Sequence, residues 1–328
     1  MKPRLVCFVP SDRAVGGIAK LLDYAVHGSR AGHPVVFCCQ SMRMGRDESL
    51  LFKKPYFLRY GGSVEVCSIK ELEPRPDDIV LFTLPSSHAV LSGHYAAAGI
   101  LKPDFIHLLQ NVRVANTAFD GGYSYRLLPK PMHRICITQE VYDAAAPLVE
   151  DQERLVIVPH GFDFDAFARP PERDDPVMIA YNTFKGDFGD IVAERYHDDP
   201  RVAEIRVSGK GISWTNLQAN YAAASIFLST PLIEEGLYLP ALEAMAAGHA
   251  VITPDAFGNR FYCDFDENCC LVAFETVEAY HAKIEWLIDN WQDFGFEMRK
   301  RAYQKAAGLG LDGEFKLFAE KLITVGHL

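Results

Sequence analysis

The chain contains 328 residues, of which 49% are hydrophobic and 23% charged, and no apolar run approaches the roughly 20 residues of a membrane-spanning helix. This composition excludes a disordered chain and a transmembrane span, and the length suits two domains. The net charge of −10 argues against general nucleic-acid binding, which requires a basic surface. Residues 1–165 are neutral overall and residues 166–328 carry the whole net charge, so we expect the two halves to have different tasks.

The first half alternates short apolar runs with helical patterns. Leu5–Val9 is followed by Gly16-Gly17, by a helical pattern over residues 18–25, and by a second apolar run, Pro34–Cys39. A strand, a glycine turn, a helix and a strand form a βαβ unit, which implies a parallel sheet. Further strands are predicted at 63–67, 78–83, 105–109, 134–138 and 155–158, and helices at 89–100 and 139–148.

A second α/β series follows a segment without periodicity. Residues 161–173 are rich in proline, aspartate and aromatic residues, which is typical of an interdomain linker. After it, strands are predicted near 177–182, 204–208, 225–229 and 250–253, and helices near 187–196, 215–223, 240–247, 276–289 and 291–306.

These elements define the predicted domains. Residues 1–160 and 174–310 are each expected to form a Rossmann-like α/β domain with a doubly wound parallel sheet. The amphipathic segment 311–328 is expected to be a C-terminal helix that packs back towards the first domain. Two such domains would face a cleft at the carboxyl ends of their strands, where ligands of parallel sheets bind.

The most informative segment is 229–253, which has the pattern of strand, loop, helix, glycine stop and strand. Pro240 stands in the first predicted helical turn, where its missing N–H costs nothing, and Gly248 stands at the expected C-cap. The backbone amides of residues 236–239 would then point out of the helix N-terminus, where an anion such as a diphosphate binds well.

Two glutamates flank this predicted anion site. Glu235 and Glu243 stand in Glu-Gly-Leu-Tyr-Leu-Pro-Ala-Leu-Glu-Ala-Met-Ala-Ala-Gly. This run resembles the E-x7-E signature of retaining glycosyltransferases with the GT-B fold (glycosyltransferase family 4-like), usually written E-G-F-G-L-P-x-L-E-A-M-A-x-G. Residues 14–17, 31–35, 156–167 and 184–186 also resemble segments of that family, so the resemblance spans nearly the whole chain.

The resemblance implies a function and a set of site residues. It implies transfer of a sugar, with retention at the anomeric carbon, from a nucleotide-diphosphate sugar to a carbohydrate or glycolipid acceptor, in surface polysaccharide or glycoconjugate synthesis. Glu235 would lie beside the sugar hydroxyls of the donor, and Glu243 would accept hydrogen bonds from its ribose. The implied catalytic residues are Glu235 and Lys185, and the implied donor-binding residues are Gly16, Gly17, Gln110, Lys210, Gly236, Leu237, Tyr238, Leu239 and Glu243.

The resemblance implies no cofactor and no metal ion, because the helix dipole, the backbone amides and Lys185 would together stabilise the leaving diphosphate. Asp163-Phe-Asp165 and Asp264-Phe-Asp266 spell D-x-D, a metal-binding pattern of another glycosyltransferase fold, but neither follows a strand of a nucleotide-binding unit. The eight cysteines form no C-x-x-C pair and are expected to be core residues.

Four departures from the family pattern leave alternatives open, and one of them is that the segment between Lys185 and Val207 is shorter than usual. The usual arginine before Lys185 is missing, so Lys210 is a candidate substitute, and Gln110 stands near the place of the usual histidine. The usual Gly-Gly-x-x-E is replaced around residues 258–262. One alternative is a non-catalytic nucleotide-sugar-binding subunit of a polysaccharide assembly complex; another is a phosphorylase or epimerase on the same fold.

Two further segments are candidates for other contacts. The resemblance implies that the acceptor lies on the side of the first domain, and sugars stack on aromatic rings. The acceptor candidates are therefore Arg113, Tyr123, Tyr125 and Arg126, all in the loop 111–130. Residues 42–60 combine five cations with seven large apolar residues from Leu50 onward. Such a segment is either a solvated loop or a weak contact with an anionic membrane surface. The first residues lack the length and cleavage site of a signal peptide, so we expect a cytoplasmic protein, with a peripheral position at the inner face of the membrane.

Overall fold

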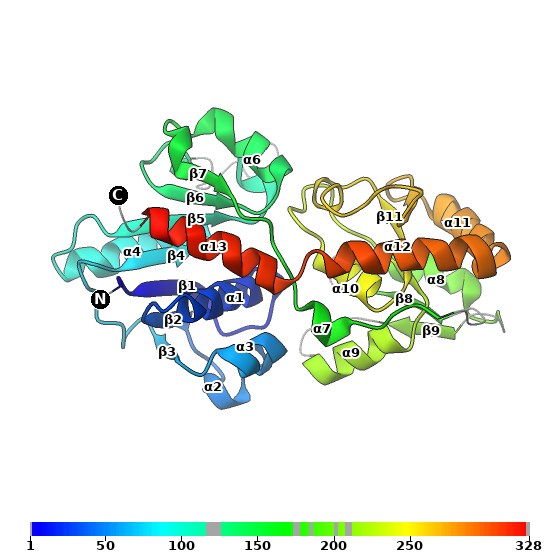
Figure 1. Ribbon diagram of the computed structural model, residues 1–328, viewed down its shortest axis with the longest axis horizontal. Coiled ribbons are helices and arrows are strands. Elements are labelled where there is room, and N and C mark those ends of the chain that lie inside the picture. Colours follow the sequence, from blue (N-terminus) through cyan, green and yellow to red (C-terminus); the bar gives the residue numbers. More distant parts are fainter. Residues whose placement is uncertain are drawn as a thin grey trace. The chain divides into compact units, whose positions relative to one another are not determined.

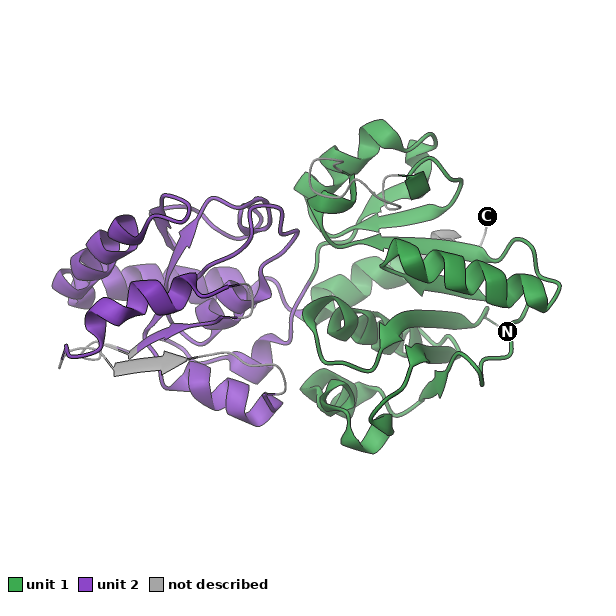
Figure 2. Cartoon of the chain, turned by 180° about the vertical axis from the view of Figure 1, so that it is seen from behind, with its two compact units in different colours: residues 1–160, 311–328 green, residues 161–310 purple. Residues whose placement is uncertain are grey.

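In the computed structural model, the chain divides into two compact units, which are coloured separately in Figure 2. Unit 1 comprises residues 1–160 and 311–328, and unit 2 comprises residues 161–310. The structure describes residues 2–115, 126–172, 178–183, 186–199, 203–206 and 212–325. The chain therefore passes between the units twice.

Within the described residues, unit 1 is built on a parallel sheet of seven strands, in the spatial order β3-β2-β1-β4-β5-β6-β7. The strands are β1 (Leu5–Ser11), β2 (Val35–Ser41), β3 (Val64–Ser68), β4 (Ile79–Phe82), β5 (Asp104–Leu109), β6 (His133–Cys136) and β7 (Leu155–Ile157). The strand order reverses between β1 and β4, where Leu5 lies opposite Ile79, so the topological switch point lies there. The predicted doubly wound sheet is confirmed.

The helices of unit 1 alternate with its strands, as predicted. They include α1 (Gly16–Arg30), α4 (Pro85–Ala97) and α6 (Gln139–Ala145), which are labelled in Figure 1. The predicted apolar face of α1 is fully buried, with Leu21, Leu22 and Ala25 at 0% exposure. At the start of α6, the Thr138 hydroxyl accepts a hydrogen bond from the Val141 amide, which caps the helix.

The segment 42–60 is helical, which the sequence analysis did not predict. It contains α2 (Gly45–Glu48), a 3₁₀ turn (Leu50–Lys53) and α3 (Pro55–Tyr60). The carboxylate of Asp12 accepts a hydrogen bond from the Met44 amide at 2.8 Å, and the Ser49 hydroxyl donates to the Asp12 carbonyl at 2.6 Å. These contacts come from the end of β1, so local sequence periodicity could not reveal them.

Helix α13 (Leu311–Val325) belongs to unit 1, and Figure 1 shows it beside α1. Its buried Glu314 accepts a hydrogen bond from Lys20 Nζ at 2.5 Å and lies 3.1 Å from His27 Nε2. Burial alone would raise the pKa of Glu314, but the Lys20 ammonium and the His27 ring hold that pKa below its usual value. Two buried charges of opposite sign therefore fasten the C-terminal helix to α1.

Unit 2 contains a second parallel sheet, with five strands in its described part in the order β12-β11-β10-β8-β9. The strands are β8 (Met178–Tyr181), β9 (Ala203–Arg206), β10 (Ile226–Leu228), β11 (Ala250–Pro254) and β12 (Cys270–Val272). The helices are α7 (Phe164–Phe167), α8 (Phe188–Ala193), α9 (Trp214–Ala222), α10 (Leu239–Ala246), α11 (Val277–Asp289) and α12 (Phe296–Ala307). Strand β12 was not predicted, although the apolar run 269–273 after a polar turn was a usable signal. The second Rossmann-like sheet is confirmed.

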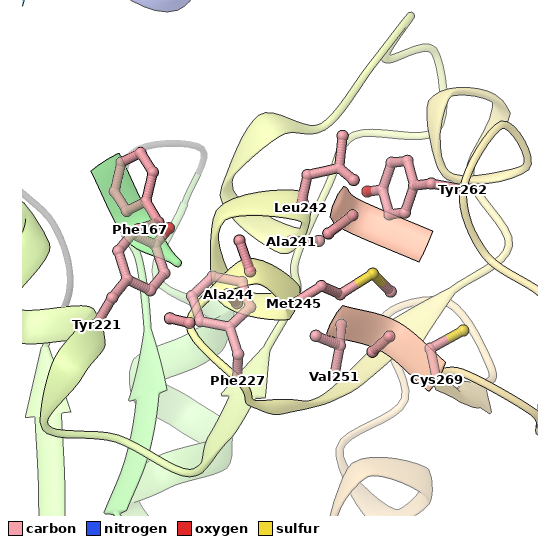
Figure 3. Packing of buried hydrophobic residues seen from close by; sticks show 14 of the residues in the cluster. Phe167, Tyr221, Phe227, Ala241, Leu242, Ala244, Met245, Val251, Tyr262 and Cys269 are labelled. Carbon is pink, nitrogen blue, oxygen red and sulfur yellow. The ribbon is translucent and has the colours of Figure 1, made fainter. Parts of the chain in front are cut away.

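Helix α10 is packed into the core of unit 2, as Figure 3 shows. Its residues Ala241, Leu242, Ala244 and Met245 are all at 0% exposure. They belong to one cluster with Tyr221, Phe227, Val251 and Tyr262. A helix of only 8 residues is not stable by itself in water. Packing of its buried side chains against the core therefore stabilises α10 more than its own helix propensity does.

The eight cysteines are all buried and unpaired, so the prediction that they are core residues is confirmed. Among the described residues, none of the helices has both the length and the apolar character needed to cross a bilayer.

The buried contact of Glu314 makes a testable contribution to stability. Replacing Glu314 with glutamine keeps the shape but removes the negative charge that Lys20 binds. Breaking a buried ion pair on one side costs about 3–5 kcal/mol. We expect Glu314→Gln to lower the free energy of unfolding by about that amount, measured by urea denaturation at neutral pH.

Asp312, on the same helix, provides the control. Its carboxylate binds Arg30 at 2.8 Å, but its side chain is 76% exposed, so Asp312→Asn should cost less than about 1 kcal/mol.

The stabilisation by Glu314 should also depend on pH. A carboxyl group with a lowered pKa, such as that of Glu314, stabilises the fold at neutral pH, and this contribution disappears as the pH falls through that pKa. The difference between wild type and Glu314→Gln should therefore shrink in acid. Equal losses in both variants would contradict this role of Glu314.

Candidate functional site

The candidate site of unit 2 is the turn that leads from β10 into α10. Tyr238 is the N-cap of α10 and Pro240 lies in its first turn, as the sequence predicts. Gly248 follows the helix with φ +79°, and a Cβ there would lie 2.7 Å from the Arg169 carbonyl oxygen, so only glycine fits. Pro240 has no N–H and the Ala241 amide donates to the Tyr238 carbonyl at 3.3 Å, so it is the positive end of the helix dipole that makes this N-terminus a favourable position for an anion.

Glu243 has a defined partner on a neighbouring helix. The Tyr221 hydroxyl, from the end of α9, lies 3.1 Å from Glu243 Oε2 and 3.1 Å from the Pro240 carbonyl oxygen. Burial, with a further contribution from the Glu243 carboxylate, raises the pKa of Tyr221 well above its usual value. The tyrosine therefore stays a neutral hydrogen-bond donor that orients a half-buried carboxylate.

Glu235 lies in the turn itself, four residues before α10. Its backbone amide donates to the Leu232 carbonyl at 3.2 Å, which closes the turn. Its side chain is partly buried, and its Oε1 atom has no contact with solvent. The structure thus places both glutamates of the sequence motif in unit 2, one before and one within α10.

A glycine that sequence reasoning recorded only as part of a departure supports this turn. Gly258 follows β11, and a Cβ on it would lie 2.7 Å from Leu237 N and 2.8 Å from the Glu235 carbonyl oxygen. These neighbours are backbone atoms, which cannot move aside cheaply. The amide of Phe257 also donates to the Ile233 carbonyl at 3.1 Å. The segment after β11 is therefore a backbone support for the turn.

Buried polar side chains continue this support. Asn259 Nδ2 donates to Thr253 Oγ1 at 2.5 Å, and Thr253 Oγ1 donates to Ser229 Oγ at 3.0 Å. The Tyr262 hydroxyl lies 2.6 Å from Asn259 Oδ1 and 3.0 Å from the Tyr238 carbonyl oxygen. These residues are buried, and a connected buried network of this kind specifies one arrangement. Both ends of the 229–238 turn are thus held by the β11 side of the sheet.

Tyr238 also reaches the opposite side of the turn. Its side chain is 3% exposed, and its hydroxyl accepts a hydrogen bond from Asn182 Nδ2 at 2.8 Å. Burial raises the pKa of Tyr238 to about 12, although the hydrogen bonds from Asn182 and Thr230 act in the other direction. Asn182 comes one residue after β8, so Tyr238 links α10 to the carboxyl end of that strand.

In unit 1 the structure brings together three of the predicted residues. Gln110 follows β5, and its Nε2 atom donates to the Gly17 carbonyl at 3.2 Å. A Cβ on Gly17 would lie 3.1 Å from Gln110 Oε1, whereas a Cβ on Gly16 would meet no described atom within 4 Å. The protein itself therefore restricts position 17, and it leaves space at position 16 for a Cβ or for a ligand.

The remaining predicted residues are not assembled by the described structure. Lys185, Lys210, Tyr123 and Tyr125 lie outside the described residues. Arg126 is exposed at the start of the chain segment after them. Arg113 is exposed, and its backbone amide donates to Asn111 Oδ1 at 2.8 Å.

The described residues contain no group of three or more histidine, cysteine, aspartate or glutamate side chains placed to hold a metal ion. Asp264, from one D-x-D sequence, binds Lys305 Nζ at 3.0 Å. His107, near the place of the expected histidine, is buried in β5 and stacked on Phe82, and burial lowers the pKa of His107 to about 3. A neutral, enclosed histidine of this kind is a core residue.

Most of unit 2 is similar in sequence to a known protein family. Residues 204–308 match the family model described as Glycosyl transferases group 1. A search of curated proteins found no significant match. The matched range contains both glutamates and the whole turn in front of α10.

Solved structures match over nearly the whole chain. HepE of Anabaena, determined with UDP-glucose, has a TM-score of 0.74 and 13% identity, with 98% of this chain and all of that chain covered. Sucrose-phosphate synthase of Thermosynechococcus elongatus has a TM-score of 0.66 and 14% identity, with 98% of each chain covered. A glycosyltransferase of Rickettsia africae has a TM-score of 0.70 and 13% identity, with 99% of this chain and 98% of that chain covered. At these identities the likeness shows the fold, which is the two-domain Rossmann-like GT-B fold.

Proposed function

We propose that this chain, which combines a GT-B fold with a glycosyl transferases group 1 domain, is a retaining glycosyltransferase of the E-x7-E type. It would transfer a sugar from a nucleotide-diphosphate sugar to a carbohydrate or lipid-linked acceptor, in polysaccharide or glycoconjugate synthesis. The observation that carries the proposal is the turn before α10, where the N-terminal end of the helix is flanked by Glu235 and Glu243. Such a site offers donors for a diphosphate and acceptors for hydroxyl groups.

Each candidate site residue between 161 and 310 has a proposed role that follows from its chemistry. The amides of residues 236–239 would bind the diphosphate, and Glu243, oriented by Tyr221, would accept hydrogen bonds from the ribose hydroxyls. Glu235 would orient the transferred sugar and stabilise positive charge at its anomeric carbon. Lys185 and Lys210 would neutralise phosphate charge. The departing phosphate oxygen would take the proton of the acceptor hydroxyl on the same face of the sugar.

Unit 1 would supply further contacts. We propose Gly16, Gly17 and Gln110 as donor contacts, since Gln110 is fixed on Gly17 and offers a neutral amide to a hydroxyl group. The acceptor would be bound by the loop with Arg113, Tyr123, Tyr125 and Arg126. Gln110 cannot transfer a proton, so no general base is assigned to it.

The proposed roles of Glu235 and Glu243 can be distinguished by experiment. Because hydrogen bonds to a charged group contribute about 1.5–3 kcal/mol, Glu243→Ala should weaken nucleoside diphosphate binding by about 10- to 100-fold. Glu235→Ala should retain nucleotide binding but lose turnover. Binding is measured by calorimetry after a screen of UDP-, GDP-, ADP- and dTDP-sugars by thermal shift, and turnover by release of the nucleotide.

Glu234→Ala is the matched control, because Glu234 is the adjacent half-buried carboxylate and has no proposed role. Full activity in both Glu235→Ala and Glu243→Ala would exclude the assigned site. Nucleotide binding without transfer to any acceptor pool would instead favour a non-catalytic nucleotide-sugar-binding subunit.

We also propose that catalysis needs no metal ion, because helix amides, the helix dipole and lysine charge would stabilise the leaving diphosphate. The wild-type protein, purified without added metal, should therefore have the same rate of transfer with EDTA as without it. Loss of activity in EDTA that Mn²⁺ restores would contradict the metal-independent mechanism.

A lipid-linked acceptor would place the enzyme at a membrane, and the segment 42–60 is the proposed peripheral contact. Met44, Leu58 and Tyr60 are exposed there, with Leu58 at 68%. The Arg46 guanidinium lies 5.8 Å from the Phe57 ring, and that of Arg59 lies 5.9 Å from the Tyr60 ring. Exposed apolar groups beside cations fit the interface of an anionic bilayer.

Vesicle sedimentation tests this contact. Because one cation near an anionic surface contributes about 1 kcal/mol, Arg59→Gln should reduce binding to phosphatidylglycerol-containing vesicles about fivefold. Leu58→Ser should also reduce it, whereas Leu101→Ser should not, although Leu101 is 81% exposed in the same unit. Equal binding of the wild-type protein to neutral phosphatidylcholine vesicles would contradict the proposal.

A further inference from the structure

Tyr238 occupies an unusual place in the turn before α10. It is the N-cap residue of the helix, with the non-helical angles φ −92° and ψ 85°, and glycine occupies this position in the signature that the segment resembles. A glycine would leave the backbone free to pivot there. Here the large side chain of Tyr238 restricts the backbone, and only 3% of the residue is exposed.

The side chain of Tyr238 connects two elements that the sheet already holds side by side. Strands β8 and β10 pair in parallel, with Leu228 opposite Tyr181. The turn 229–238 leaves the end of β10, and Asn182 leaves the end of β8. The turn therefore runs from the end of β10 to the N-cap of α10, and the hydrogen bond from Asn182 Nδ2 to the Tyr238 hydroxyl ties that N-cap to the end of the adjacent strand β8.

This hydrogen bond is shielded from water and is reinforced. Asn182 is 6% exposed, and water competes poorly for a hydrogen bond at such depth. Thr230, near the start of the same turn, also hydrogen-bonds to Tyr238. The carbonyl of Tyr238 accepts from the Tyr262 hydroxyl at 3.0 Å, on the β11 side. The N-cap residue is thus held through its side chain and through its backbone.

We propose that Tyr238 and Asn182 are a pair of positioning residues that preset the α10 N-terminus for the β-phosphate of the donor. This inference rests on the proposed function and names two residues beyond its binding groups. The amides of residues 236–239 would bind an anion strongly only if they already point at it, because ordering them on binding would consume affinity. The pair acts through the backbone and need not touch the nucleotide.

The test compares a nucleoside diphosphate with its own monophosphate. The nucleoside is the one whose diphosphate binds wild type best among uridine, guanosine, adenosine and thymidine. Tyr238→Phe keeps the ring and its packing but loses the hydroxyl. We expect it to weaken diphosphate binding about fivefold to tenfold, as for one buried hydrogen bond, and monophosphate binding less than twofold.

Two further variants make the result specific. Asn182→Ala should reproduce the selective loss, and the double variant should lose no more than either single variant, because both remove the same hydrogen bond. Tyr196→Phe is the matched control. Tyr196 is also a buried tyrosine of unit 2, and its hydroxyl donates to the His281 carbonyl at 3.4 Å, outside the turn. It should leave the ratio of diphosphate to monophosphate affinity unchanged.

The outcomes separate this inference from the function on which it rests. If wild type binds a diphosphate and Tyr238→Phe weakens both nucleotides equally, or neither, the positioning role is wrong while the proposed function stands. Additive losses in the double variant would also overturn it. If wild type binds none of the four diphosphates, the proposed function fails and this inference fails with it. Thermal melting of each variant verifies that the compared proteins are folded.

Discussion

The N-terminus of α10 can act as an anion site only while the turn in front of it keeps one conformation. Its amides carry partial charges, so their attraction for a phosphate depends on direction as well as distance. Unit 2 provides that constraint through packing. The helix is buried on the core, Gly258 lies against the backbone of residues 235–237, and Tyr238 is hydrogen-bonded on both sides. The chemistry proposed for the turn depends on these contacts.

Within each unit, neutral groups rather than ions supply the described hydrogen bonds of the candidate residues. Tyr221 orients Glu243 as a protonated hydroxyl, Asn182 holds Tyr238 through an amide, and Gln110 lies on Gly17 in unit 1. Neutral donors fixed in place by burial need no counterion and do not change charge near neutral pH. This arrangement suits recognition of hydroxyl groups and phosphate oxygens. The strongly ionic contacts described in unit 1 have a different task, because Lys20 and Glu314 fasten the C-terminal helix.

Local sequence patterns predicted the strands of both sheets because buried parallel strands are continuous apolar runs. They failed where a contact from elsewhere decides the structure. The segment 42–60 is helical, and Asp12, at the end of β1, holds its start by binding the amide of Met44. Strand β12 is only three residues long and is stabilised by pairing with β11. Gly258 was recorded as part of a departure from a motif, whereas its role depends on the backbone that lies against it.

The sequence alone determined the parallel α/β organisation and the position of Glu235, Glu243 and the helix N-terminus, because periodicity, proline and glycine act over a few neighbouring residues. The tertiary structure alone decided which side chains hold that turn, since Asn182 and Tyr238 are 56 residues apart in the chain. It also decided which side chains join the last helix to unit 1, since Glu314 and Lys20 are 294 residues apart. Such contacts depend on how the sheets bring distant strand ends and helices together, and no local pattern encodes that.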